Sequence, residues 1–102
     1  MTAFDKIRKW GEDKGLIGKN GKATIDGQLE KLQEEFFELK RAIALNDQAE
    51  IIDAIGDMVV VLALLADLRK TTIECCVFCA YCEIANRTGK MVDGVFVKDK
   101  KA

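Results

Sequence analysis

Residues 25–43 read IDGQLEKLQEEFFELKRAI, and this stretch decides the fold. Its apolar side chains recur at intervals of 4, 3, 4, 3 and 4 residues, which is the repeat of an α-helix with one continuous apolar face. The pattern predicts a long helix, starting at about residue 25, that packs along its length against a second helix. The apolar residues of this face are Ile25, Leu29, Leu32, Phe36, Leu39 and Ile43.

The region before this stretch is predicted to hold a short helix and a loop. Phe4, Ile7 and Trp10 share one side of an amphipathic helix over residues 2–14. Trp10 and Phe4, like Tyr81 farther along the chain, could stack a nucleobase, but aromatic residues at helical spacing are more often part of the core, which is the favoured interpretation. Residues 15–22 contain three glycines, but their spacing fits neither the dinucleotide-binding pattern nor the Walker pattern. The loop is therefore not predicted to be a phosphate-binding loop of either type.

A second long helix is predicted directly after the first. Asn46 and Asp47 end the first helix, and Asp47-x-x-Glu50 resembles a capping box that opens the next one. From Met58 to Ala66 this second helix is apolar almost all round, which is typical of a helix buried on most of its surface. Since a single chain of 102 residues has little else to cover such a helix, the pattern favours association of several chains.

The C-terminal third is predicted to form one more helix and an extended tail. Thr71-x-x-Glu74 is a second capping box, and it opens a helix that runs to about residue 86. Residues 91–97 then form a short extended or hairpin-like tail, with a bend at Gly94.

Composition and charge are those of an ordinary folded domain. Of the 102 residues, 49% are hydrophobic and 32% are charged, as in one folded domain over residues 1–102, and the lack of proline favours long uninterrupted helices. Together with the helices predicted above, the expected fold class is all-α. A net charge of −1 gives no reason to expect a nucleic acid polymer as partner. Acidic residues interrupt the apolar stretch 51–68, and the N-terminus lacks the apolar run of a signal peptide. We therefore expect no membrane contact and a cytoplasmic location.

Four cysteines lie within eight residues, which is unlike a disulfide framework that joins distant parts of a chain. Their spacing is compatible with a site for zinc or an iron–sulfur cluster, but it is also the spacing of one helix face. Small buried apolar side chains in a helix interface are the favoured interpretation. The four are Cys75, Cys76, Cys79 and Cys82.

Two groups of acidic side chains lie near the turn that joins the two long helices. A short connection makes the helices antiparallel, so that the two groups can face one another. Converging carboxylates repel unless a cation compensates them, and a chain without histidine offers oxygen ligands that suit Mg²⁺ or Mn²⁺. The alternative is an ordinary solvated helix face. The acids are Glu34, Glu35 and Glu38 on the first helix and Glu50, Asp53 and Asp57 on the second.

These two strings resemble a known family. Glu34-Glu35-Phe-Phe-Glu38, followed by Glu50-Ile-Ile-Asp53-Ala-Ile-Gly-Asp57, resembles the EExxE and ExxD signature of the MazG-like all-α nucleoside triphosphate pyrophosphohydrolases. The sequence of residues 80–98 is similar to the ending of small phage-encoded members, so the resemblance covers about residues 28–98.

The resemblance implies a fold, a reaction and an assembly. The fold is a four-helix-type bundle with a short extended tail, assembled as a homodimer or homotetramer in the cytoplasm, which is the host's if the protein is phage-encoded. The reaction is hydrolysis of a (d)NTP to (d)NMP and pyrophosphate, by attack of water on the α-phosphorus, with Mg²⁺ or Mn²⁺ as cofactor.

The resemblance also assigns the acidic residues. Glu35, Glu38 and Asp57 match the family's metal ligands best, while Glu34 matches a second-metal ligand or water-activating base, so Glu34 and Glu35 are the catalytic candidates. Many relatives carry a further acid where this chain has Ala54. Either or both of two neighbouring acids therefore complete the predicted ligand set, namely Glu50 and Asp53.

Substrate contacts are expected from the last helix and the tail. Arg87 and Lys90 match basic positions of the family and suit a triphosphate. Tyr81 and Cys82 lie in the stretch that many relatives use, although those relatives carry asparagine in place of Cys82.

A non-catalytic helical oligomer, or a nucleotide-binding interaction module, is the competing hypothesis. The acid missing at Ala54 and the substitution at Cys82 support it. The two hypotheses differ in one requirement, because the enzyme needs a divalent cation and the scaffold does not.

Overall fold

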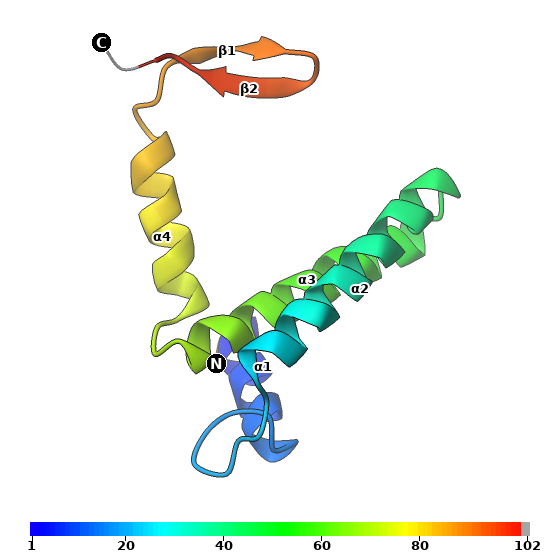
Figure 1. Ribbon diagram of the computed structural model, residues 1–102, viewed down its shortest axis with the longest axis vertical. Helices are drawn as coiled ribbons and strands as arrows, with labels where there is room; N and C mark the ends of the chain where they lie inside the picture. Colours follow the sequence, from blue (N-terminus) through cyan, green and yellow to red (C-terminus); the bar gives the residue numbers. More distant parts are fainter. Residues whose placement is uncertain (101–102) are drawn as a thin grey trace.

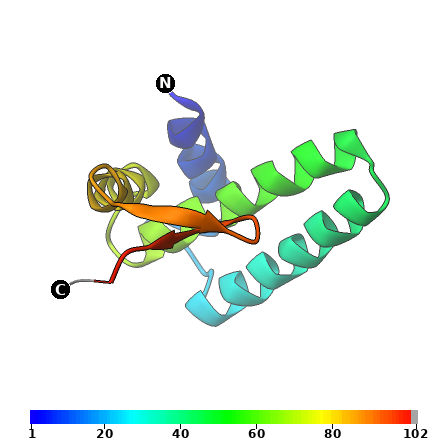
Figure 2. The same ribbon diagram turned by 90° about the horizontal axis from the view of Figure 1, so that it is seen from above.

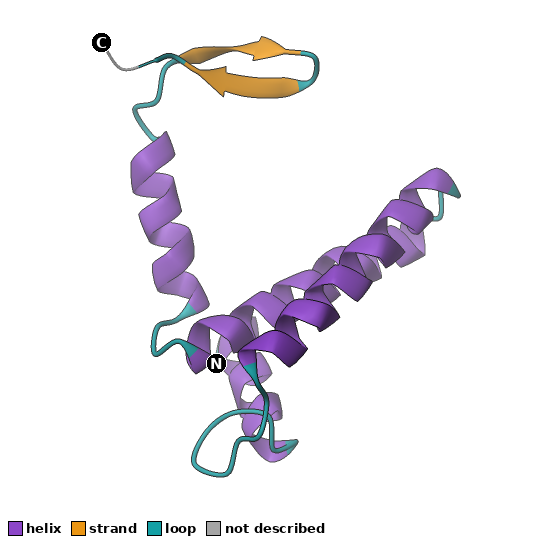
Figure 3. Ribbon diagram, viewed as in Figure 1, coloured by secondary structure: helices purple, strands orange, loops and turns teal. Residues whose placement is uncertain are grey.

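Four helices and a C-terminal β-hairpin make up most of the computed structural model, which describes residues 1–100 (Figures 1 and 3). This confirms a mostly helical chain with an extended tail. In chain order the elements are α1 (Ala3–Asp13), α2 (Ile25–Ala44), α3 (Gln48–Leu68), α4 (Ile73–Ile84), β1 (Gly89–Val92) and β2 (Val95–Lys98).

Helices α2 and α3 form an antiparallel hairpin that is the framework of the chain (Figures 1 and 2). A three-residue turn joins them: Asn46 adopts a left-handed conformation (φ 53°), and the Asp47 carboxylate accepts a hydrogen bond from the Glu50 backbone N–H at 3.2 Å. The predicted break and cap are thus confirmed. Ala42 and Ala54 are buried, and their small side chains let the two helices approach closely.

The apolar face of α2 is divided rather than buried as a whole. Leu32 and Leu39 are half-buried, whereas Leu29, Phe36 and Ile43 are exposed. The α2 residues that are most buried are Glu35 and Ala42. Helix α3 therefore packs against one flank of the predicted face, and the other flank is open in a single chain.

Helix α1 packs against α3 and is followed by the glycine-rich loop. Thr2 caps α1 through a capping box with Asp5. Near the other end Gly11 is buried, and the loop folds back so that Ile17, only 3% exposed, lies against it. The Trp10 side chain is 47% exposed, so its predicted place in the core is wrong, because α1 presents this edge to a hollow beside α3.

Helix α4 leaves the framework after its first residue (Figure 1). Ile73 is buried, but the rest of α4 is exposed. The cap is Thr72, whose hydroxyl accepts a hydrogen bond from the Cys75 N–H, and not Thr71 as predicted, because the helix begins one residue later, at Ile73. The Glu74 carboxylate accepts two hydrogen bonds at 2.7 Å from Arg8 of α1.

Because α4 projects away, nothing in the same chain covers its cysteines. All four are free and exposed, so the expected burial of these side chains is not met within one chain. Among residues 1–100, the grouping of potential metal ligands that the structure forms involves carboxylates and not these thiols.

The tail is a two-stranded antiparallel hairpin with Val92 opposite Val95. Asp93 and Gly94 both have positive φ, at 49° and 82°, as a two-residue turn between twisted strands requires. Both strands are exposed.

Within residues 1–100 of one chain, the four helices do not close into a bundle (Figure 2).

No helix in the described part of the chain is both long and apolar enough to cross a membrane.

Two glycine-to-alanine substitutions test this packing. At Gly11 a Cβ would lie 2.8 Å from Leu64 Cδ2 and 3.2 Å from Ile17 Cγ1, whose side chains are buried and cannot yield. We expect Gly11→Ala to lower the free energy of unfolding by about 1–3 kcal/mol.

At Gly56, in the middle of α3, a Cβ meets nothing within 4 Å, so Gly56→Ala should stabilise by about 1 kcal/mol through helix propensity. Urea unfolding measures both, and a Gly11→Ala variant as stable as the parent chain would contradict the packing described.

Candidate metal centre

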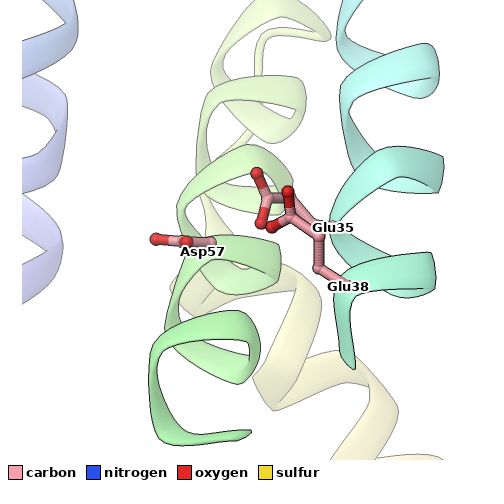
Figure 4. Close-up of side chains that lie close together, drawn as sticks. All are labelled: Glu35, Glu38 and Asp57. Atoms are coloured by element: carbon pink, nitrogen blue, oxygen red, sulfur yellow. The ribbon is translucent and has the colours of Figure 1, made fainter. Parts of the chain in front are cut away.

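Three carboxylates converge at the middle of the α2–α3 hairpin. Glu35 and Glu38 stand one turn apart on α2, and Asp57 comes from the antiparallel α3 (Figure 4). One oxygen from each side chain lies within 4.8 Å of an oxygen from each of the others. These are the three residues that the sequence resemblance singles out as the best-matching ligands, and the structure brings them together.

Glu35 is the most unusual member because it is a charged residue in the helix interface. Its exposure is 4%, and Lys31 Nζ lies 3.3 Å from its Oε1. Its second oxygen, Oε2, is buried and has no hydrogen-bond partner among residues 1–100. A buried carboxylate oxygen without a partner is costly, by about 1–3 kcal/mol or more, and marks a place where a partner is missing. A cation is one partner that fits.

Asp57 is the member whose protonation is most affected by its surroundings. Burial raises the pKa of the Asp57 carboxyl, and the negative charges of Asp53 and Glu35 raise this pKa further. The fold therefore holds the Asp57 carboxyl where its charged form is disfavoured by burial and by neighbouring acids. Asp53 is exposed, but it is close enough to Asp57 to belong to the same electrostatic environment.

Two other predicted acids lie apart from this cluster. Glu34 is exposed and has Lys31 Nζ at 3.4 Å. Glu50 lies at the start of α3, by a shallow hollow near the connecting turn that Glu38 also lines. Ala54, which takes the place of an acid in many relatives, is buried in the helix hairpin at 3% exposure, so no ligand comes from that position.

The predicted substrate residues are not brought to the carboxylates within one chain. Tyr81 and Cys82 are exposed on α4, Lys90 lies in β1, and Arg87 lies between them beside a hollow at the junction of α4 and the hairpin. This whole arm stands away from the α2–α3 hairpin (Figure 1).

A cavity that the sequence did not reveal lies directly beside the cluster. Glu35 and Asp57 form part of its wall, together with Trp10, Lys22 and Lys31. In the sequence, the residues of this cavity appear as a single tryptophan followed by a glycine-rich loop with lysines. The spacing of the glycines fits no known phosphate-binding pattern, so the sequence did not point to a site there.

Comparison with known proteins gives one phage relative. A 60-residue segment is 42% identical to an uncharacterized 18.2 kDa protein in the rep-hol intergenic region of Haemophilus phage HP1, and the match covers 59% of this chain. The matched segment covers 35% of the length of that relative. No known protein-family profile matches the chain. No solved structure matches it either.

The raised pKa of Asp57 predicts a specific pH dependence of stability. A carboxyl whose pKa is higher in the folded state binds more protons there, so its contribution to stability falls as pH rises from about 3.8 through the folded pKa. In chelator, Asp57→Asn should remove this loss and be more stable than the parent chain at neutral pH. Thermal unfolding of both proteins between pH 3 and 8 measures the difference in their stability. The contributions of the other carboxyls are common to both proteins and cancel in this difference. A difference that does not change with pH would refute the electrostatic account.

Proposed function

We propose that this chain is a metal-dependent nucleoside triphosphate pyrophosphohydrolase of the MazG-like type, which converts a (d)NTP into (d)NMP and pyrophosphate. The observation that carries the proposal is the buried, unpartnered Oε2 of Glu35 within a group of three carboxylates. The similarity to a phage protein is in keeping with the resemblance to small phage-encoded members.

The donor set suits a hard divalent cation. All three candidate ligands are carboxylates, the chain has no histidine, and three negative charges call for compensation. Mg²⁺ or Mn²⁺ would be held by Glu35, Glu38 and Asp57, with Asp53 as the neighbouring acid. When bound, such an ion lowers the pKa of a coordinated water and neutralises phosphate charge.

The reaction breaks one phosphoanhydride bond. A water oxygen forms a bond to the α-phosphorus, the bond from this phosphorus to the bridging oxygen breaks, and pyrophosphate leaves. The resemblance assigns to Glu34 the role of the base that takes the proton of the water. Glu34 is exposed in one chain and shares Lys31 with Glu35, so its carboxylate has to turn toward the cluster to act there. Glu35 orients the site from its buried position, where Lys31 fixes one of its oxygens.

A glutamine substitution at Glu38 tests the proposal against a matched control. Purified protein is incubated with each common NTP and dNTP in Mg²⁺, Mn²⁺ or chelator, and products are separated by ion exchange. We expect monophosphate and pyrophosphate, no product in chelator, and a fall in turnover of at least about 100-fold in Glu38→Gln. Glu30→Gln, an exposed glutamate of the same helix outside the cluster, should retain full turnover.

Other product patterns would change the conclusion. Diphosphate and phosphate would refute attack on the α-phosphorus, and hydrolysis that persists in chelator would refute the metal. The absence of any product would favour a non-catalytic nucleotide-binding module, for which the burial of Ala54 in place of an acid is the structural argument.

We further propose that several copies of the chain assemble to form the active protein. One chain exposes 8120 Å², whereas a compact monomer of 11.3 kDa exposes about 5,700 Å². Its radius of gyration is 16.4 Å, against about 13 Å for a compact domain of this length. The excess of about 2,400 Å² per chain is the area that an obligate interface between subunits buries.

The exposed side chains indicate which surfaces these copies would cover. The open flank of α2 presents Phe36 and Ile43, and α4 presents Val77, Phe78 and Ile84. A helix of 12 residues and an isolated two-stranded hairpin are each marginally stable in water without a covering partner. A second copy of the chain supplies such a partner and completes the helical bundle predicted from the sequence.

A charge placed in the α4 surface tests this assembly. Phe78 is 66% exposed in one chain, so Phe78→Asp should fold normally if the chain is a monomer. We expect light scattering to give a multiple of 11.3 kDa for the parent chain and for Phe78→Leu, and Phe78→Asp to shift the protein toward monomer or unfolded chain. A parent chain that is monomeric and stably folded at micromolar concentration would contradict the assembly.

A further inference from the structure

The cavity beside the carboxylates has the size and the walls of a small-molecule site. Its volume is about 710 Å³, within the range of about 300–1,000 Å³ typical of ligand pockets. Residues of helix α1, the glycine-rich loop, and parts of α2 and α3 line it, and it is open to solvent on one side. Its lining includes Trp10, Leu16, Lys22 and Lys31, and the acids Glu35 and Asp57 close one side of it.

The glycine-rich loop is built as a fixed wall of this cavity. Backbone hydrogen bonds close the loop on itself, from Lys22 N–H to the Gly15 carbonyl at 2.9 Å and from Ala23 N–H to the Leu16 carbonyl at 3.0 Å. Ile17 is buried beneath it. At Gly21 a side chain would collide with the Ile17 backbone, so the close crossing of the chain requires glycine there. The loop therefore presents Leu16 and Lys22 to the cavity in a defined geometry.

Trp10 is the flat apolar surface of the cavity. Its side chain is 47% exposed, and it also borders a second hollow of about 360 Å³ that Lys6 and Val60 line and that reaches Asp57. An exposed indole is a surface on which a nucleobase stacks, with a typical contribution of about 1–3 kcal/mol.

The cavity also carries positive charge next to its acids. Lys22 and Lys31 line it, and the ion pair of Lys31 with Glu35 keeps this ammonium at the edge of the carboxylate cluster. A ligand that combines a flat ring with a chain of negative charges matches this order of indole, ammonium groups and candidate metal ligands.

From this juxtaposition we propose that the cavity is the nucleotide subsite, with the base on Trp10 and the phosphates between Lys22, Lys31 and the acids. The proposal rests on the proposed function, since it places the α-phosphorus beside Glu35 and Asp57. It also gives the glycine-rich loop a role, as the wall that holds Lys22 toward the phosphates.

Fluorescence tests binding without relying on turnover. Trp10 is the single tryptophan of the chain, so tryptophan emission reports on the surroundings of this one side chain, at the cavity and the adjoining hollow. The probe is a set of nucleoside triphosphates in which an imido group replaces the oxygen between the α- and β-phosphorus, titrated in Mg²⁺. We expect a saturable change in Trp10 emission, and affinity about 10-fold weaker in Lys22→Gln. Lys19→Gln, in the same loop but outside the cavity lining, should bind like the parent chain.

Kinetics of Trp10 variants separate this proposal from the proposed function. Trp10→Phe keeps an aromatic surface and should keep KM near that of the parent chain, whereas Trp10→Leu should raise KM about 10-fold with little change in kcat. Hydrolysis with no emission change, and with equal KM in both variants, would overturn the subsite and leave the proposed function standing. Saturable emission changes without hydrolysis of any nucleotide would support the subsite and overturn the proposed function. Equal binding by Lys22→Gln and Lys19→Gln would overturn the phosphate contact.

Discussion

The burial of the Glu35 carboxylate between α2 and α3 is the constraint on which the site depends. A glutamate in a helix interface is unfavourable unless its charge is compensated, and Lys31 reaches only one of its two oxygens. Glu38 and Asp57 bring two further carboxylates to within 4.8 Å of the Glu35 carboxylate. A buried carboxylate oxygen without a hydrogen-bond partner costs stability at this interface.

The framework around Glu35 accounts for the position of the cavity. Small side chains at Ala42 and Ala54 bring α2 and α3 together, and the packing of Leu64 and Ile17 on Gly11 fixes α1 and the loop against the same α3. The acids and the cavity therefore share walls that belong to the best-packed part of the chain. The arm formed by α4 and the hairpin lies outside this part, which leaves it available to a second copy.

Local rules in the sequence were sufficient for the elements but not for their packing. Helical periodicity, the Asp47 cap and the bend at Gly94 each depend on neighbouring residues, and the structure confirms the elements that they predicted. The burial of Glu35 does not follow from helical periodicity, because it depends on α3 packing on one flank of the α2 face, which takes Glu35 into the interface. The departure of α4, the exposure of Trp10 and the cavity result from long-range packing, which residue spacing does not encode.

Binding of Mn²⁺ in the absence of nucleotide tests the central claim most directly. Paramagnetic resonance measures the free ion during titration, so affinity is obtained without catalysis. The account predicts saturable binding to the parent chain and to Glu30→Gln, and affinity at least about 10-fold weaker in Glu35→Gln. No binding by the parent chain, or equal binding by Glu35→Gln, would contradict the assignment of the buried Glu35 carboxylate as a metal ligand.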